Sequence, residues 1–152
     1  MRAVVQRVGF ARVTVLGETV GEIGQGLLVY LGCGKGDTPS DVDWLVSKIL
    51  ELRVFENEGG KMDRSVLDAG GALLVVSQFT LYGDVRRGRR PSFDAAMAPG
   101  EANALYELFL ARARARLITQ AGRFQAEMRV VSENLGPVTL WIESPKSGLM
   151  AT

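Results

Sequence analysis

The sequence predicts a single α/β domain in which mixed or antiparallel strands form the body and two main helices flank it. Three observations lead to this prediction. Strand-like patterns dominate the first third of the chain, two helical patterns stand far apart, and no linker, repeat or low-complexity tract divides residues 1–152. Because the helices do not alternate regularly with strands, the pattern is not that of a doubly wound repeat.

The first strands are predicted by two different patterns. Residues 11–15 alternate apolar with polar side chains, and Gly17 and Glu18 offer a turn into a second strand at 19–23. Residues 27–31 form a continuous apolar run, which is typical of a strand buried on both faces.

The first helix is predicted to begin after Thr38. This residue can cap the helix, Pro39 suits the first helical position, and Asp41 stands three residues after the cap. Apolar residues then follow at helical spacing and predict an inward face made by Val42, Leu45, Val46, Ile49 and Leu52.

The rest of the chain adds strands and the second helix. A strand is predicted to end at 53–55, and residues 73–76 form another buried strand. Pro99 begins the second helix and Gly122 is expected to end it. Its inward face is predicted to contain Leu105, Leu108, Phe109, Ala113 and Leu117. Strands at 126–131 and 138–142 complete the pattern.

Composition excludes several kinds of chemistry. The sequence has no histidine, which rules out a Ser-His-Asp triad, a Cys-His pair, a histidine base and histidine metal ligands. Cys33 is the only cysteine, so a small buried hydrophobe is the better interpretation than a reactive thiol. We therefore predict no metal and no cofactor.

Charge and hydropathy set the expected surroundings. Lys and Arg total 18 against 17 Asp and Glu, so the protein has no generally basic coat. The longest apolar runs fall far short of the roughly 20 residues that a membrane helix needs. The first residues lack the apolar stretch of a signal peptide. These features predict a cytoplasmic protein without a membrane partner.

A glycine-rich stretch at 32–38 has the outline of a phosphate-binding loop between a strand and a helix. A P-loop needs Gly-Lys followed by Ser or Thr, whereas Lys35 is followed by Gly36. The spacing also misses the dinucleotide fingerprint. A plain turn is the better interpretation.

Three other segments are candidate functional sites. The basic loop containing Arg86, Arg87, Arg89 and Arg90 suits phosphate oxygens, although a solvated surface loop remains the alternative. Residues 77–81 follow a buried strand, where backbone amides are well placed to bind an oxyanion. Residues 134–139 contain a Gly-Pro pair, which is ordinarily a turn but can also point carbonyl oxygens into a site.

Taken together, these segments resemble the D-aminoacyl-tRNA deacylase family, also called the D-tyrosyl-tRNA deacylases. The resemblance runs nearly end to end. The matching motifs are residues 1–8, 26–29, 48–49, 52–55, 60–62, 77–81, 88–93 and 136–139. The resemblance implies a compact body of sheets closed into a barrel, and a homodimer with active sites at the subunit interface. It implies hydrolysis of the ester that joins a D-amino acid, or glycine, to the 3′ end of tRNA.

The resemblance also implies roles for individual residues. Ser77, Gln78, Phe79 and Thr80 would line the pocket for the terminal adenosine and the aminoacyl group. Gly136 and Pro137, as a cis pair, would reach into the partner's active site, where their carbonyl oxygens reject the side chain of an L-amino acid. Three further residues would support the site, namely Arg7, Phe124 and Met128.

Three positions depart from the family's usual pattern. Leu135 stands where the family usually has Asp, Asp63 where it tends to have Asn, and Gln125 where it tends to have Gly. Leu135 is the departure nearest the predicted site. It is expected to alter the local hydrogen bonding of the Gly-Pro turn, while the pair itself is intact.

The chemistry leaves two routes open. Thr80 is the obvious side-chain nucleophile, but residues 77–81 contain no base to deprotonate it. The free ribose hydroxyl beside the ester can instead orient or activate water, while the backbone amides of Phe79 and Thr80 stabilise the oxyanion. We favour this RNA-assisted route over a covalent Thr80 enzyme. A non-catalytic tRNA-binding module and a small-ester hydrolase remain rival functions.

Overall fold

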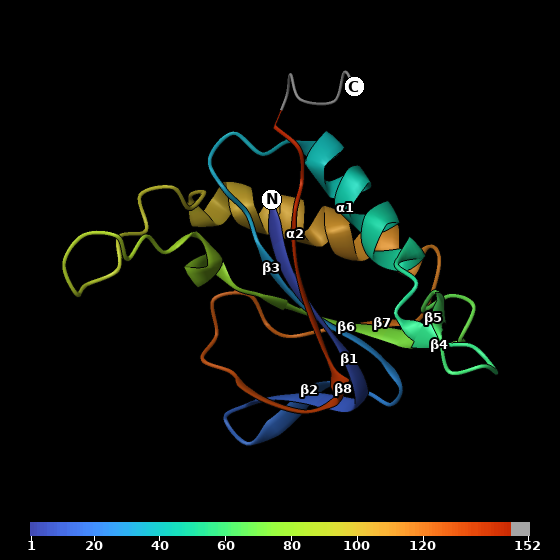
Figure 1. Cartoon of the computed structure of the whole chain (residues 1–152). Helices are drawn as coiled ribbons and strands as arrows, with labels where there is room; N and C mark the ends of the chain where they lie inside the picture. The colour runs from blue at the N-terminus through green and yellow to red at the C-terminus, as the bar shows by residue number, and fades with distance from the viewer. Residues whose placement is uncertain (147–152) are drawn as a thin grey trace.

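The computed structural model describes residues 1–146 and confirms the mixed α/β architecture (Figure 1). One sheet has the order β2-β1-β3-β6-β7. The long strand β1 pairs with β3 through its first half and with β2 through its second half, and β8 pairs with β1 along nearly its whole length. The pairs of β1 are antiparallel, whereas β6 runs parallel to β3 and to β7. The strands are β1 (Arg2–Val15), β2 (Glu18–Ile23), β3 (Gly26–Gly32), β6 (Ala72–Ser77), β7 (Thr119–Ala121) and β8 (Arg129–Glu143), and a separate hairpin contains β4 (Phe55–Glu56) and β5 (Met62–Arg64).

The sheet curls until its two edges meet, which gives the barrel-like body that the resemblance implied. Strand β1 bends through register shifts in its pairing with β2 and with β8. At the meeting edges, a Cβ placed on Gly21 of β2 would lie 2.6 Å from the carbonyl oxygen of Ala121 in β7. A side chain at Gly21 would therefore force the two edges apart.

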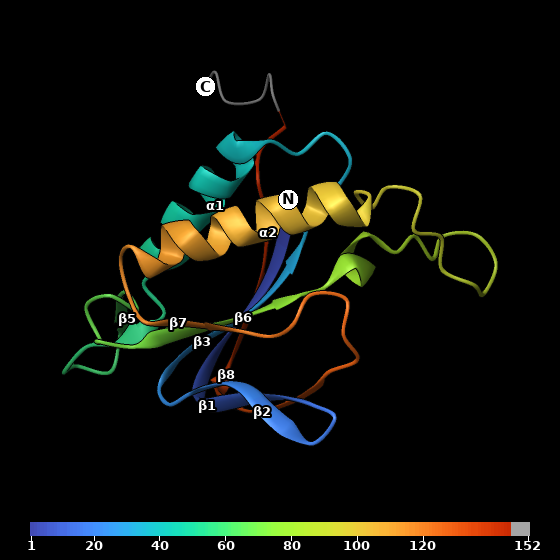
Figure 2. The same cartoon turned by 180° about the vertical axis from the view of Figure 1, so that it is seen from behind.

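Helices α1 (Pro39–Glu51) and α2 (Pro99–Arg114) pack against one side of the sheet (Figure 2). The predicted cap of α1 is present, since the Thr38 N–H donates to the Asp41 carboxylate at 2.8 Å. The larger core lies between helices and sheet and contains Leu27, Val29 and Leu31 of β3. Leu28 belongs to a second core on the opposite sheet face, which confirms that this strand is buried on both sides.

Two sequence predictions in the second half are wrong. The second helix ends at Arg114, so Leu117 is not helical and Gly122 does not end it. Residues 119–121 form β7 instead, because parallel pairing with β6 satisfies their backbone. The strand expected at 126–131 begins only at Arg129 and continues through 138–142 as β8. No helix within residues 1–146 is long and apolar enough to cross a membrane.

Candidate active site

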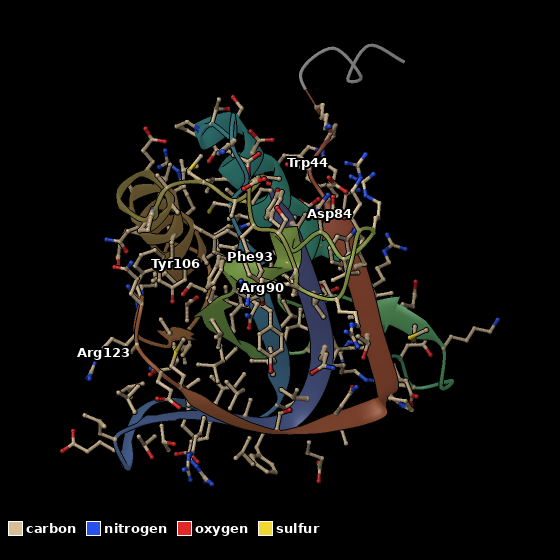
Figure 3. All side chains as sticks on the ribbon, turned by 90° about the vertical axis from the view of Figure 1, so that its left-hand side faces the viewer. Trp44, Asp84, Arg90, Phe93, Tyr106 and Arg123 are labelled. Carbon is tan, nitrogen blue, oxygen red and sulfur yellow. The ribbon has the colours of Figure 1, made fainter. Side chains whose placement is uncertain are left out.

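A cavity of about 790 Å³ opens where the parallel strands β3 and β6 end, beside the start of α2. Ligands commonly bind at the carboxyl ends of parallel strands. Figure 3 looks onto this side of the molecule and labels Phe93, Tyr106 and Arg90. Five of the predicted site residues line the cavity, namely Ser77, Gln78, Phe79, Phe124 and Met128.

The chain turns sharply at the cavity rim. After β6 the Gln78 N–H donates to the Leu31 carbonyl at 2.7 Å, and a 3₁₀ turn, η1 (Phe79–Tyr82), follows. The sequence predicted a polar strand end with backbone amides placed for an oxyanion, but it did not predict the 3₁₀ turn. Because the first amides of a helix lack an acceptor inside it, the N–H groups of Phe79 and Thr80 have no partner within residues 1–146. Two adjacent free amides are the donors that an oxyanion requires.

Thr80 is the second residue of this turn, but it does not line the cavity. Its exposed hydroxyl accepts a hydrogen bond from the side-chain amide of Gln78. Within residues 1–146, no carboxylate or amine is hydrogen-bonded to that hydroxyl. The Gln78 amide therefore holds the Thr80 hydroxyl in place, but it cannot act as a base that removes the hydroxyl proton.

Cys33 stands in the cavity wall at the end of β3 and is only 7% exposed. Burial raises the pKa of its thiol to about 12, because the charged thiolate loses its hydration. The thiol is therefore protonated at neutral pH. This confirms the interpretation of Cys33 as a small buried hydrophobe.

The opposite wall is a loop between β7 and β8. The Phe124 ring lies 5.8 Å from the ring of Tyr106, and the Arg123 N–H donates to the Met128 sulfur at 3.4 Å. Gln125, which follows Phe124 in this loop, has φ 60°, in the left-handed region that favours glycine. This backbone conformation explains physically why glycine would suit that position.

Gly136 and Pro137 form an exposed turn within β8, and their peptide bond is cis. Arg7 holds this turn, since its Nε donates to the Leu135 carbonyl at 3.3 Å and its Nη1 to the Val54 carbonyl at 2.8 Å. The Leu135 side chain takes no part in these bonds. The turn does not line the cavity of its own chain.

The side chain of Asn134, the first residue of the predicted 134–139 segment, closes the same turn. The Val138 N–H donates to Asn134 Oδ1 at 3.2 Å, and Asn134 Nδ2 donates to the Thr139 hydroxyl at 2.9 Å. The turn is therefore hydrogen-bonded from inside by Asn134 and from β1 by Arg7. An aspartate at position 135 is not needed for these bonds.

The basic loop is closed at its base by backbone hydrogen bonds, and its four arginines differ in whether they form an ion pair. Asp84 and Ser92 exchange two backbone hydrogen bonds, of 2.7 and 2.9 Å. Arg86 pairs with Asp84 at 2.6 Å, and this bond lowers the pKa of Asp84 to about 2. The other three arginines are exposed and have no ion pair within residues 1–146, namely Arg87, Arg89 and Arg90.

The base of the loop also joins the cavity. Phe93 lines the cavity and stands edge-on to Phe79, with ring centroids 5.0 Å apart. Sequence reasoning missed Phe93 and Tyr106 as cavity residues. Tyr106 has the helical spacing of core residues, and a cavity wall of this kind has no separate sequence signal.

A family model and several curated relatives are similar to this chain over nearly its whole length. The family model described as D-Tyr-tRNA(Tyr) deacylase matches residues 4–143. A D-aminoacyl-tRNA deacylase of Symbiobacterium thermophilum is 57% identical over 148 residues, covering 97% of this chain and 98% of the relative. One of Clostridioides difficile is 54% identical over 148 residues, covering 97% and 99%.

Solved structures agree on the fold. One described as the c-Myc DNA Unwinding Element Binding Protein has a TM-score of 0.91 and 45% identity, covering 95% of this chain and 99% of its own. A second, described as a probable eukaryotic D-amino acid tRNA deacylase, has a TM-score of 0.81 at 20% identity, covering 93% and 97%. The second likeness bears on the fold alone.

Proposed function

The chain belongs to the D-Tyr-tRNA(Tyr) deacylase family, and from this premise we propose how it selects and cleaves its substrate. It is an ester hydrolase, a D-aminoacyl-tRNA deacylase. It releases a free D-amino acid and tRNA, also clears glycine mischarged on tRNA(Ala), and spares L-aminoacyl-tRNA. This is chiral proofreading in translation, and its place is the cytoplasm. The observation that carries the proposal is the pair of adjacent amides at Phe79 and Thr80, which have no partner within residues 1–146 and belong to the turn at the cavity rim.

The hydrolytic step uses these amides and the RNA itself. The tRNA 2′-hydroxyl orients or activates a water molecule that attacks the ester carbonyl. The oxyanion that forms accepts hydrogen bonds from the Phe79 and Thr80 N–H groups. When the tetrahedral intermediate collapses, the 3′-oxygen of tRNA leaves with a proton and the D-amino acid is released. The hydrogen-bonded Thr80 hydroxyl, with no base beside it, supports this route over a covalent one.

The chiral gate is provided by a second copy of the chain. The Gly136–Pro137 turn is exposed and lies away from its own cavity, which supports its insertion into the partner's cavity. Its carbonyl oxygens would then occupy the space that the side chain of an L-amino acid needs. A D-amino acid directs its side chain elsewhere, and glycine has none. In a two-fold dimer the exchange is reciprocal, so both sites gain the gate.

The decisive test of the function compares three esters of tRNA. We expect D-Tyr-tRNA and glycyl-tRNA to be hydrolysed and L-Tyr-tRNA to be cleaved at least about 100-fold more slowly, the ratio that an uncompensated clash of ~3 kcal/mol produces. Release of labelled amino acid measures all three rates. D-Tyr ethyl ester serves as the control, because a general small-ester hydrolase would cleave it as readily as the tRNA. Equal rates for D-Tyr-tRNA and L-Tyr-tRNA would rule out the gate.

The exposed apolar side chains of β8 are the proposed dimer surface. Val131 is 45% exposed and Trp141 is 54% exposed, and Leu135 and Leu140 lie on the same strand. The double substitution of Val131→Asp with Leu140→Asp should give an inactive monomer, because each carboxylate would be desolvated in the interface. Light scattering and the deacylation rate measure this. Leu16→Asp, at a 98% exposed hairpin position, is the control that should stay dimeric and active. An active monomer would contradict the shared site.

The basic loop is the proposed contact with tRNA phosphates. Replacing Arg89 and Arg90 by Gln should weaken tRNA binding and flatten the dependence of log K on log salt by roughly 1.5, since two phosphate contacts release fewer counterions. Single-turnover cleavage at saturating tRNA should change little. The matched control, Arg53→Gln with Asp63→Asn, removes an exposed ion pair outside this loop without changing the net charge, so its salt slope should stay as in the wild type. An unchanged slope in the Arg89 and Arg90 variant would make the loop a solvated surface.

A further inference from the structure

Arg2, at the start of β1, contacts both the η1 turn and β8. Its Nη1 donates to the Leu81 carbonyl at 3.0 Å, inside η1, and its guanidinium lies 4.3 Å from the centroid of the Tyr82 ring. On the other side, its Nε pairs with Glu143 at 3.3 Å, and the Trp141 ring centroid is 5.5 Å away. One side chain therefore ties the turn to the strand that also carries the Gly136–Pro137 turn.

Few other polar contacts hold η1. The Gln78 N–H anchors the start of the turn to β3, and the Gly83 N–H closes its end on the Thr80 carbonyl at 2.9 Å. Within residues 1–146, Arg2 makes the single hydrogen bond from a side chain outside η1 to a carbonyl of this turn. A short 3₁₀ turn has poor hydrogen-bond geometry of its own, so an external anchor matters for its position.

We propose that Arg2 is a positioning residue for hydrolysis, which holds η1 so that the Phe79 and Thr80 amides point at the oxyanion. The inference rests on the proposed function, because it needs these amides to act in the reaction. Arg2 touches neither the cavity nor the proposed RNA surface. Its loss therefore displaces the amides while leaving the binding surfaces for tRNA in place. A small displacement of such donors lowers the rate of the chemical step more than it lowers binding.

The test compares Arg2→Met, Arg2→Lys and Arg12→Met with the wild type. Arg12 lies on the same strand and pairs with Glu22 at 3.9 Å, away from η1, so it is the matched control. We expect Arg2→Met to lower the single-turnover rate on D-Tyr-tRNA about 10- to 100-fold, with unchanged tRNA affinity and with the dimer intact by light scattering, because Trp141 beside Arg2 belongs to the proposed dimer surface. Arg2→Lys should recover most of the rate, since an ammonium can also donate to the Leu81 carbonyl and lie over the Tyr82 ring. Arg12→Met should match the wild type.

Hydrogen exchange separates positioning from general loss of stability. In Arg2→Met, the amides of Leu81 and Gly83 should exchange faster while the core of β3 and β6 keeps its protection. Faster exchange throughout the protein, or a rate equal to that of the wild type, would overturn the proposal for Arg2. A wild-type protein that leaves D-Tyr-tRNA intact would overturn the proposed function, and the role of Arg2 with it. An active wild type with a fully active Arg2→Met variant defeats the positioning role alone.

Discussion

Replacing Phe79 by proline is expected to lower the single-turnover rate of D-Tyr-tRNA hydrolysis about 10²–10³-fold below that of Phe79→Ala, the usual cost of one oxyanion donor. The proline removes the backbone N–H, whereas alanine removes only the ring and keeps the amide. The comparison between these two variants isolates a backbone donor that ordinary side-chain substitution cannot reach. Rapid-quench measurement at saturating tRNA gives both rates.

The local backbone suits this substitution. Proline is favoured at the first position of a helical turn, and the Phe79 N–H has no acceptor to lose within residues 1–146. The preceding Gln78 has φ −145° and ψ 82°, outside the helical region that a following proline disfavours. Both variants should therefore unfold at similar temperatures. Equal rates for the proline and alanine variants would show that the Phe79 amide does not stabilise the oxyanion.

The second large effect concerns the substrate. A tRNA whose terminal adenosine lacks the 2′-hydroxyl, with D-Tyr on the 3′-oxygen, should bind normally. It should react at least about 10²-fold more slowly, because the group that orients or activates water is missing. Thr80→Ala should in contrast keep much of the wild-type rate, since the Thr80 N–H remains. Single-turnover rates for both changes, with tRNA affinity measured separately, decide between the two routes.

The covalent route predicts the opposite order. Thr80→Ala would then be inactive, the deoxy substrate would react, and an acyl group could be trapped on Thr80 and found by mass spectrometry. Thr80→Ser is the matched control, because it keeps a hydroxyl for the Gln78 amide and loses only a methyl group. A folded Thr80→Ala protein that binds tRNA but cannot cleave it would reverse our preference.

Local patterns predicted much of the fold, because several elements carry their signals in neighbouring residues. Helix α1 begins with Thr38 and Pro39 as the capping pattern requires, and β3 is buried on both faces as its apolar run indicates. Strand β7 has no such signal. Its three residues are held by parallel pairing with β6, a contact between distant parts of the chain that no window of sequence reveals.

The candidate site likewise has features that the sequence predicted and features that it did not. The segments that gather at the cavity were found through their motifs, but the geometry of each could not be predicted. The 3₁₀ turn that frees the Phe79 amide depends on packing against the end of β3. The ion pair that separates Arg86 from its neighbours joins residues only two positions apart, but it depends on the local backbone conformation at Asp84, where the loop is closed by backbone hydrogen bonds to Ser92. The proposed gate is a contact between two copies of the chain, and local sequence patterns carry no signal for such a contact.

The proline in β8 has a consequence for solubility. Strand β8 pairs with β1 on one side, and no other strand within residues 1–146 pairs with its other side, which leaves that backbone edge available to another chain. A long edge of this kind, with apolar side chains, is a template for aggregation. Pro137 has no N–H to offer, and Gly136 and Pro137 turn the chain near the middle of the strand. The same pair that we assign to chiral selection thus also interrupts the edge along which fibril-like stacking would otherwise grow.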